Sequence, residues 1–252
     1  MFKILPKHIS FYNKNGFLVC RKLFNKKESA MLKLYTNEVK NFIPQKNKHM
    51  IYFDNIKNSK NIVLTRTENF MPYHKNFRNL FKKKKILGLV SGLFGSKAVL
   101  FKDKINWKQP GGKGFEPHQD SQVWEGMYKA KTFMSVLISV DEANKNNGCL
   151  EIVANKHKIG LLGNNKSAIP PKIVKKLNWK KIITKPGDAI FFDSYTPHRS
   201  KKNNTKKSRN IIYLTYNLLS DGDLRKKYFK DKRISFPPNN ERRKGKNYKY
   251  LI

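Results

Sequence analysis

VLFKDKINWK, residues 99–108, alternates between apolar and polar side chains. The apolar residues share one parity: Val99, Phe101, Ile105 and Trp107. The polar residues share the other parity: Lys102, Lys104, Asn106 and Lys108. Successive side chains of a strand point to opposite faces, so this alternation predicts a long strand with one buried, apolar face.

Further strands are predicted downstream, each of them short and bounded by turn residues. They cover residues 132–140, 149–154, 180–184, 189–193 and 209–217. The turns between them include PGG at 110–112, NNG at 146–148 and PGD at 186–188. Short strands separated by such turns are typical of an antiparallel sandwich or jelly roll. We therefore predict a mainly β fold with flanking helices.

The N-terminal part has a different pattern. A strand is expected over 11–24, and Asn25 with Glu28 has the spacing of a capping box that opens a helix. Residues 43–62 are polar and are expected to form a loop, and a second helix is expected over 76–94. These helices would cover one sheet of the jelly roll.

The 252 residues contain no internal repeat and no linker rich in Pro, Gly or Ser, which predicts one domain. Within it we expect a mostly helical part at 1–97, a jelly-roll core at 98–219 and a C-terminal extension at 220–252. With 38% hydrophobic and 12% aromatic residues, the chain can bury a core in spite of its charge.

The chain is strongly basic, with 54 Lys and Arg against 17 Asp and Glu and a formal net charge of +37. Such a surplus suggests nucleic acid, because Lys and Arg neutralise phosphates. However, 45 of these residues are Lys and nine are Arg, and Arg is the better reader of phosphate and guanine. The lysines are scattered, and no basic run interleaves aromatics in the manner of a stacking platform. We therefore favour a solvated lysine surface over a nucleic-acid groove.

No stretch of the sequence predicts a membrane span. The longest nearly apolar stretch, ILGLVSGLFG at 86–95, is about half of the roughly 20 residues that a membrane helix needs. The first 20 residues lack the continuous apolar region of a secretory signal. Two cysteines are too few for a disulfide framework. The expected location is the cytoplasm, without a membrane partner.

The segment with the clearest chemistry is FEPHQD, residues 115–120. His118 and Asp120 are two residues apart, so on an extended strand both side chains point to the same side. Together with His198, in TPHRS, they supply two nitrogens and one oxygen. This is the ligand set of the facial triad, which holds non-haem Fe(II) and leaves positions open for cosubstrate and oxygen. The same three residues also suit catalytic zinc.

A basic residue follows the second histidine at an informative place. Arg209 comes eleven residues after His198 and opens the apolar stretch RNIIYLTYN. A buried cation needs an anion, and a dicarboxylate cosubstrate would provide one through two parallel hydrogen bonds. The alternative for Arg209 is an ordinary salt bridge.

In these residues and the sequence around them, the chain resembles the phytanoyl-CoA dioxygenase family of Fe(II) and 2-oxoglutarate-dependent oxygenases. The resemblance runs from GFLVCRKLFNKKESAMLK through FKDKINWKQPGGKGFEPHQD and KPGDAIFFDSYTPHRSKKN to DKRISFPPNNER, nearly the whole chain. It implies a double-stranded β-helix, the cupin-like jelly roll. It also implies that His118, Asp120 and His198 bind the catalytic iron, and that Arg209 anchors the distal carboxylate of 2-oxoglutarate. O2 would be the second cosubstrate, with ascorbate as a reductant in vitro.

Within the family, KINWKQPGGKGFEPHQD and FFDSYTPHRSKKN look most like members that hydroxylate the carbon next to phosphorus in 2-aminoethylphosphonate. The resemblance therefore implies a small polar substrate, an organophosphonate. The same chemistry on an acyl-CoA, an ectoine-like solute or a quaternary-ammonium phosphonate stays open. A further alternative, from another class, is a basic nucleic-acid-binding protein built on a degenerate jelly roll.

Several residues are candidates for the walls of the site because of their strand parity. We expect the cofactor side to include Lys104 and Asn106, from the polar face of 99–108, and Tyr213, which shares parity with Arg209. The substrate side would include Lys108, Gln122 and Trp124, the last two with the parity of His118 and Asp120. Arg199 is excluded, because it would point away from His198. Arg66 and Glu68 are expected to form a structural ion pair.

Overall fold

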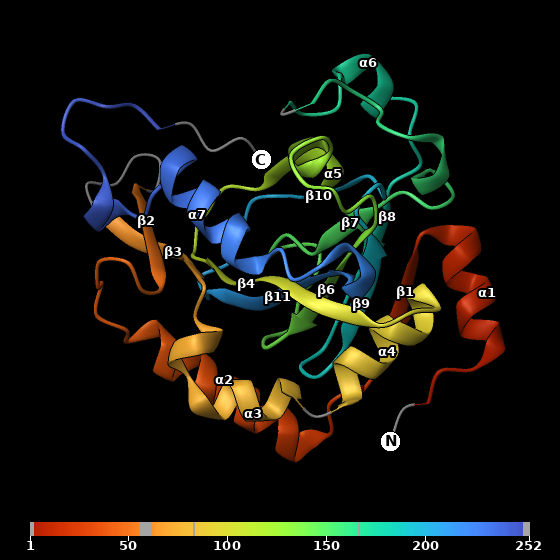
Figure 1. Cartoon of the computed structure of the whole chain (residues 1–252), viewed down its shortest axis with the longest axis horizontal. Coiled ribbons are helices and arrows are strands. Elements are labelled where there is room, and N and C mark those ends of the chain that lie inside the picture. The colour runs from red at the N-terminus through yellow and green to blue at the C-terminus, as the bar shows by residue number, and fades with distance from the viewer. Residues whose placement is uncertain (1–2, 56–61, 83, 166, 249–252) are drawn as a thin grey trace.

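The computed structural model describes residues 3–55, 62–82, 84–165 and 167–248 (Figure 1). Its architecture is a jelly roll, a double-stranded β-helix made of two antiparallel sheets. In the described residues the larger sheet has seven strands, in the order β1-β9-β6-β11-β4-β3-β2, and the smaller has four, in the order β5-β10-β7-β8. The predicted mainly β fold with flanking helices is confirmed.

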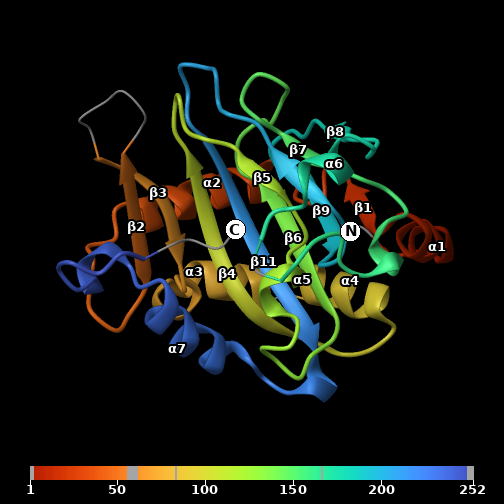
Figure 2. The ribbon, with the colours of Figure 1, turned by 90° about the horizontal axis from the view of Figure 1, so that it is seen from above.

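The strands of the larger sheet, in sheet order, are β1 (Phe17–Cys20), β9 (Ala189–Asp193), β6 (Phe133–Ser139), β11 (Arg209–Leu218), β4 (Ala98–Lys108), β3 (Ile62–Glu68) and β2 (Met50–Asn55). Those of the smaller sheet are β5 (Phe115–His118), β10 (His198–Ser200), β7 (Leu150–Ile152) and β8 (Lys180–Ile182). Figure 2 shows the larger sheet as a row of adjacent strands. Each strand that was predicted after residue 98 is present, with ends that match the prediction or differ from it by one or two residues.

The α-helices are α1 (Pro6–Asn15), α2 (Lys26–Lys40), α3 (Lys75–Lys82), α4 (Lys84–Phe94), α5 (Ser121–Trp124), α6 (Pro171–Val174) and α7 (Arg225–Ser235). Short 3-10 turns lie at Met71–Tyr73, His157–Ile159, Leu219–Asp221 and Asn239–Glu241. Helix α2 begins at the predicted capping box, because Asn25 Oδ1 accepts from Glu28 N (2.9 Å) and Glu28 Oε2 accepts from Asn25 N (2.8 Å). No helix in the described ranges has the length and apolar content needed to cross a membrane.

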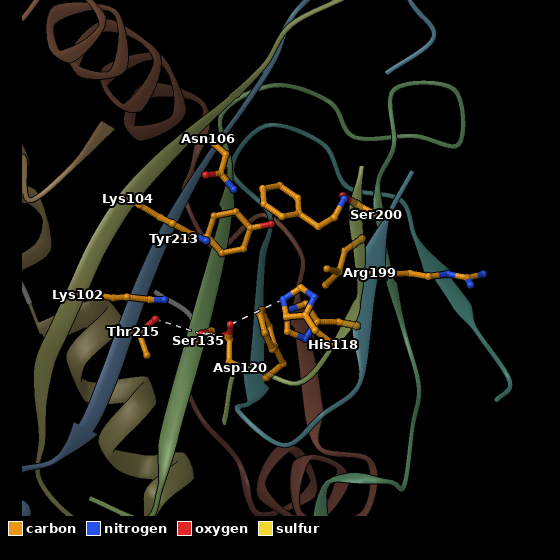
Figure 3. Close-up of a pocket in the computed structure, with 14 residues that line it drawn as sticks. Lys102, Lys104, Asn106, His118, Asp120, Ser135, Arg199, Ser200, Tyr213 and Thr215 are labelled. Atoms are coloured by element: carbon orange, nitrogen blue, oxygen red, sulfur yellow. Dashed lines mark hydrogen bonds and ion pairs between the residues drawn. The ribbon is translucent and has the colours of Figure 1, made fainter. Parts of the chain in front are cut away.

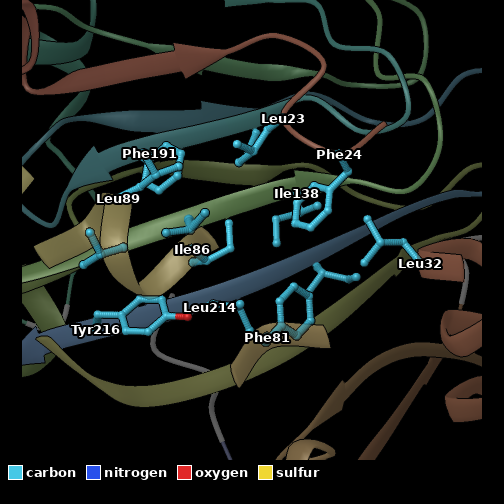
Figure 4. Close-up of a cluster of buried hydrophobic side chains, with 14 of the residues drawn as sticks. Leu23, Phe24, Leu32, Phe81, Ile86, Leu89, Ile138, Phe191, Leu214 and Tyr216 are labelled. Carbon is cyan, nitrogen blue, oxygen red and sulfur yellow. The ribbon is translucent and has the colours of Figure 1, made fainter. Parts of the chain in front are cut away.

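The largest apolar core lies between the helices and the outer face of the larger sheet. Helices α2, α3 and α4 run along this face (Figures 1 and 2). Leu32, Phe81 and Ile86 from the helices pack against Ile138 and Leu214 from the sheet (Figure 4). This layer confirms that the N-terminal helices cover one sheet, and it leaves the inner face of that sheet to the second sheet and the pocket between them.

The N-terminal part differs from its prediction in three places. Residues 11–24 are not one strand: α1 extends to Asn15, Gly16 (φ 79°) ends it, and only Phe17–Cys20 is extended. The polar segment 43–62 contains the edge strand β2, with residues 56–61 outside the described residues. The helix predicted over 76–94 is described as two, α3 and α4, and residue 83 between them is also outside the description.

The N-terminal part thus completes the larger sheet with β1, β2 and β3 instead of serving only as a helical cover. The division of the chain at 97, 98 and 220 remains a prediction.

The long strand β4 departs from strict alternation at one point. Its pairing with β11 shifts between Thr215 and Tyr216, so that Thr215 lies opposite Lys102 and Tyr216 lies opposite Leu100. As a result Phe101 does not join Ile105 and Trp107 in the outer core, as its parity predicted. It packs instead with Trp124, Phe133 and Tyr228 in a separate cluster beneath α7.

Candidate metal centre and its pocket

The two histidines are brought together by strand pairing in the smaller sheet. His118 ends β5 and His198 begins β10, and the two residues are directly opposite each other in the antiparallel register. Their ring centroids are 4.2 Å apart. Asp120 follows two residues after β5, where the chain turns into α5. One potential ligand atom from each of these three residues lies within 4.8 Å of the others.

Hydrogen bonds fix the tautomer of each ring. A backbone carbonyl can only accept, so His118 Nδ1 donates to Glu116 O (2.6 Å) and His198 Nδ1 donates to Thr196 O (3.0 Å). Each Nε2 therefore presents a lone pair to the space between the rings. Burial lowers the pKa of both histidines, that of His118 to about 3. Both imidazoles are consequently neutral, as metal ligands must be.

The carboxylate of Asp120 is oriented from the opposite sheet. Ser135 Oγ, on β6, donates to Asp120 Oδ2 (2.7 Å), and Thr215 Oγ1, on β11, lies 3.1 Å from the same serine oxygen. The other carboxylate oxygen, Oδ1, is 4.0 Å from His118 Nε2. Burial alone would raise the pKa of Asp120, but the nearby charges, with Lys102 foremost, hold it below its usual range. Asp120 is therefore ionised.

Two neutral imidazole nitrogens and one carboxylate oxygen, converging from two strands and a turn, fit a non-haem Fe(II) centre. The donors are held from behind by backbone carbonyls and a serine hydroxyl, as second-shell partners hold metal ligands elsewhere. Their free sides face a pocket of about 420 Å³, counted with its open mouth (Figure 3).

The pocket lies between the two sheets and draws on both. Its wall is formed by Lys102, Lys104, Asn106, Phe115, His118, Asp120, Ser135, Leu150, Phe192, His198, Arg199, Ser200, Tyr213 and Thr215. Lys102 reaches from β4 toward Asp120, and Lys104 reaches from the same strand toward Tyr213 (Figure 3). The Lys104 ammonium lies 4.9 Å from the ring centroid of Tyr213, and burial lowers its pKa. Among these wall residues Asp120 is the single acid, so the pocket carries a surplus of positive charge.

Arg209 lies further along β11 and is not part of this wall. It is 3% exposed, and its Nε has no hydrogen-bond partner among the described residues. Burial lowers its pKa. In the described part of the chain no Asp or Glu forms an ion pair with it, so the salt bridge considered as an alternative is absent. A buried guanidinium without an anion is a ready position for a carboxylate that arrives with a ligand.

None of the three predicted substrate residues is part of the pocket wall. Lys108 Nζ donates to Ser200 Oγ (2.8 Å) and Lys201 O (2.6 Å), which ties β4 to the smaller sheet. The strand assumed for Gln122 and Trp124 was wrong, because β5 ends at His118 and these two residues belong to α5.

Both α5 residues have structural contacts instead. The Gln122 side chain accepts from Gln119 N (2.8 Å) and donates to Asn164 O (3.1 Å). Trp124 is buried in the cluster of Phe101. A period-two pattern cannot show that the chain turns at Asp120.

Other predicted residues lie where their parity placed them. Lys104, Asn106 and Tyr213 are in the pocket wall, although their roles there stay predictions. The guanidinium of Arg199 turns away from the histidines, as expected, onto Glu151 (Nε–Oε2 2.7 Å) and the ring of Trp179 (4.2 Å to the centroid). The structural ion pair of Arg66 and Glu68 is present, at 2.8 Å.

Seven wall residues were not predicted: Lys102, Phe115, Ser135, Leu150, Phe192, Ser200 and Thr215. For Lys102 a signal existed, since it shares the polar parity of Lys104. Phe115 belongs to the FEPHQD segment itself. Ser135 and Thr215 interrupt otherwise apolar strands, and each is completely or almost completely buried. A buried hydroxyl in a strand interior needs a partner, which is a usable signal for the support of a site.

Comparison with known proteins agrees with this geometry. The family model of phytanoyl-CoA dioxygenase matches residues 12–211. The chain is 38% identical over 235 residues to a 2-aminoethylphosphonate dioxygenase of uncultured bacterium HF130_AEPn_1, covering 93% of this chain and 89% of the relative. It is 35% identical over 226 residues to a methylphosphonate hydroxylase of Gimesia maris, covering 89% and 85%.

Among solved structures, the fold is similar to that of EctD from S. alaskensis, crystallised with 2-oxoglutarate and 5-hydroxyectoine. The TM-score is 0.75 at 19% identity, over 86% of this chain and 77% of that one. This similarity supports the jelly-roll fold.

Proposed function

The chain belongs to the phytanoyl-CoA dioxygenase family of Fe(II) and 2-oxoglutarate-dependent oxygenases, and on this premise we propose that it hydroxylates the carbon next to phosphorus in a small organophosphonate such as 2-aminoethylphosphonate. The observation that carries the proposal is the pocket itself. Two neutral histidines and an ionised aspartate converge at its floor, and Lys102 and Lys104 give its wall a positive surplus. Relatives named for two phosphonates support the substrate class.

In this proposal His118 and His198 would each hold Fe(II) through Nε2, and Asp120 would hold it through a carboxylate oxygen. When bound, Fe(II) and 2-oxoglutarate supply with O2 the oxidising power that converts a C–H bond to C–OH, while 2-oxoglutarate leaves as succinate and CO2. The backbone carbonyls of Glu116 and Thr196 keep both imidazoles oriented, and Ser135 keeps Asp120 turned toward them. These contacts fix the donors before any ligand arrives.

Arg209 would receive the distal carboxylate of 2-oxoglutarate. It shares strand and parity with Tyr213 and Thr215, and Thr215 lies beside Ser135 at the level of the donors. Asn106 and Tyr213 lie between these two levels on the neighbouring strands β4 and β11. The buried Oδ1 of Asn106 has no partner among the described residues, and this side chain is a candidate to hydrogen-bond the cosubstrate.

The proposal predicts substrate-dependent turnover. Purified enzyme with Fe(II), ascorbate and 2-oxoglutarate should form succinate faster when 2-aminoethylphosphonate or methylphosphonate is added. Phosphorus NMR should show a 1-hydroxy product in an amount equal to the stimulated succinate, and mass spectrometry should find one atom of labelled oxygen from O2 in it. Stimulation by an acyl-CoA or ectoine, with none by any phosphonate, would replace the proposed substrate and leave the oxygenase chemistry in place.

The support of Asp120 gives a second prediction. Ser135→Ala removes the hydroxyl that orients the carboxylate, so Fe(II) affinity should fall by about 10- to 100-fold, as expected for a lost second-shell partner. The measurement is an anaerobic Fe(II) titration, with thermal melting to confirm folding. Thr215→Val is the matched control, because it removes the outer hydroxyl only and should cost less. An unchanged affinity in Ser135→Ala would contradict the role given to Ser135.

The proposal includes a reducing, cytoplasmic location. In support, Cys20 and Cys149 are both buried as free thiols, and burial raises the pKa of Cys20 to about 12. Such thiols are inert and do not demand an oxidising compartment.

A further inference from the structure

The chemistry of a phosphonate restricts where its anionic group can bind. The carbon that is hydroxylated carries the phosphorus, so the phosphonate oxygens are only two bonds away from it. That carbon must lie beside the metal donors. The group that binds the phosphonate must therefore also lie beside them, deep in the pocket and not at its mouth.

Lys102 has this position. It comes from β4, lines the pocket, and is directly opposite Thr215, whose hydroxyl contacts the serine that supports Asp120. It is 8% exposed, and its ammonium is 4.1 Å from the ring centroid of Trp124. Lys104, two residues further along β4, lies on the same face, and its ammonium is near the ring of Tyr213. Two ammonium groups thus border the space above the donors.

The same wall offers nothing of opposite charge to a substrate amine. Asp120 is its single acid, and that carboxylate is directed to the metal position and bonded to Ser135. Glu68 is opposite Lys104 on β3 but is paired with Arg66 and is not part of the wall. Aromatic faces bind ammonium groups elsewhere, but those of the wall have neighbours already: Lys104 lies 4.9 Å from the ring of Tyr213 and 5.7 Å from that of Phe115, and the ring of Phe192 lies 4.8 Å from that of His198. Trp124, outside the wall, is covered by Lys102.

From this arrangement we propose, on the basis of the proposed function, that Lys102 and Lys104 form the phosphonate-binding subsite and that the enzyme recognises the phosphonate group without recognising an amino group. This places Lys104 on the substrate side, whereas we expected it from the sequence on the cofactor side. Alkylphosphonates without an amine are then its preferred substrate class. An ammonium placed beside two lysines is repelled and has no counter-charge in the wall. The zwitterion 2-aminoethylphosphonate is accepted through its phosphonate alone.

Ethylphosphonate and 2-aminoethylphosphonate test the amine directly, because they share the same carbon skeleton and differ by one amino group. Succinate formation and phosphorus NMR should give a kcat/KM for ethylphosphonate equal to or higher than that for 2-aminoethylphosphonate. A preference of about tenfold or more for the amine, a difference of roughly 1.4 kcal/mol, would overturn the proposal. Turnover of neither compound, nor of methylphosphonate, would instead refute the proposed function.

Lys102→Met tests the subsite. This substitution keeps most of the side-chain length over Trp124 and removes the charge. Losing one charge-assisted hydrogen bond to the phosphonate should weaken binding roughly 10- to 100-fold. The binding of ethylphosphonate would be measured by anaerobic calorimetry on enzyme loaded with Fe(II) and 2-oxoglutarate. The dissociation constant for 2-oxoglutarate, measured in the same way on Fe(II)-loaded enzyme, should rise much less than that for ethylphosphonate.

Lys97→Met is the matched control, since Lys97 is exposed and immediately precedes the same strand. It should leave both affinities unchanged. Lys102→Arg, which keeps the charge, should recover most of the phosphonate affinity, whereas a purely structural role would make both Lys102 variants melt at lower temperature. Lys104→Met should show the same selective loss. Unchanged phosphonate affinity in Lys102→Met, or a loss confined to 2-oxoglutarate in Lys104→Met, would overturn the assignment of that lysine.

Discussion

Replacing His198 by alanine is expected to abolish iron binding and turnover together. His198 supplies one of three donor atoms that lie within 4.8 Å of one another, and its ring is opposite that of His118. Removing the imidazole leaves one nitrogen and one carboxylate, which cannot complete the facial set. Loss of a partner behind a ligand already costs about 10- to 100-fold in affinity, so loss of the ligand itself should exceed that.

The measurement is iron content after anaerobic loading and gel filtration, combined with succinate formation. Wild-type protein should also melt at a higher temperature with Fe(II) than without it, because a ligand that binds only the folded state stabilises it. This metal-dependent increase should vanish in His198→Ala. His8→Ala is the control, since His8 is in the first turn of α1, where its Nδ1 accepts from Leu5 N (3.1 Å), and it is not one of the three donors. Full iron loading by His198→Ala would refute the proposed centre.

The sheet could be predicted from sequence wherever local periodicity carried the signal. Strand β9 has the predicted bounds of 189–193, and β11 extends one residue beyond the predicted 209–217. These strands are apolar and bounded by turns, so a window of a few residues contains the information. Strand β2 was missed because its residues, MIYFDN, stand within a polar segment and pair with a single neighbour at the sheet edge. That pairing depends on the tertiary structure and cannot be predicted from the local sequence pattern.

In the candidate site, too, residues with a local sequence signal were predicted and those placed by tertiary contacts were not. The sequence predicted that His118, Asp120 and His198 lie together, from the two-residue spacing of the first two and the motif around the third. The structure places the three residues together. Gln122 and Trp124 were misplaced because the same spacing rule was extended across a turn into α5. Ser135 could not be assigned to Asp120 from sequence, since that contact joins two sheets and depends on the register of β6 with β11.

Arg209→Met is expected to weaken 2-oxoglutarate binding strongly while leaving iron binding intact. The guanidinium is buried at the start of β11 without an ion-pair partner in the described chain, which supports the proposal that it receives a carboxylate of the cosubstrate. Removing one partner of a buried, charge-assisted pair costs about 2 to 5 kcal/mol. The KM for 2-oxoglutarate and its dissociation constant should rise accordingly, as measured by steady-state kinetics and by anaerobic calorimetry with iron-loaded enzyme.

The stability of the same variant distinguishes a binding role from a structural one. A buried cation without an ion-pair partner opposes folding, so replacing it with an apolar side chain of similar length should leave the melting temperature of the ligand-free protein unchanged or raise it. The increase in melting temperature that 2-oxoglutarate produces in the wild type should be lost in Arg209→Met.

Two further variants serve as controls. Arg209→Lys keeps the charge but not the two parallel hydrogen bonds and should bind 2-oxoglutarate with intermediate affinity. Arg21→Met, at a largely exposed arginine paired with Asp188, is the control for general loss of a guanidinium. If Arg209→Met melts far below the wild type and still binds 2-oxoglutarate normally, Arg209 is a structural residue. The cosubstrate must then be held by another cation of the wall, such as Lys104. In that case Lys104 would not belong to the phosphonate subsite.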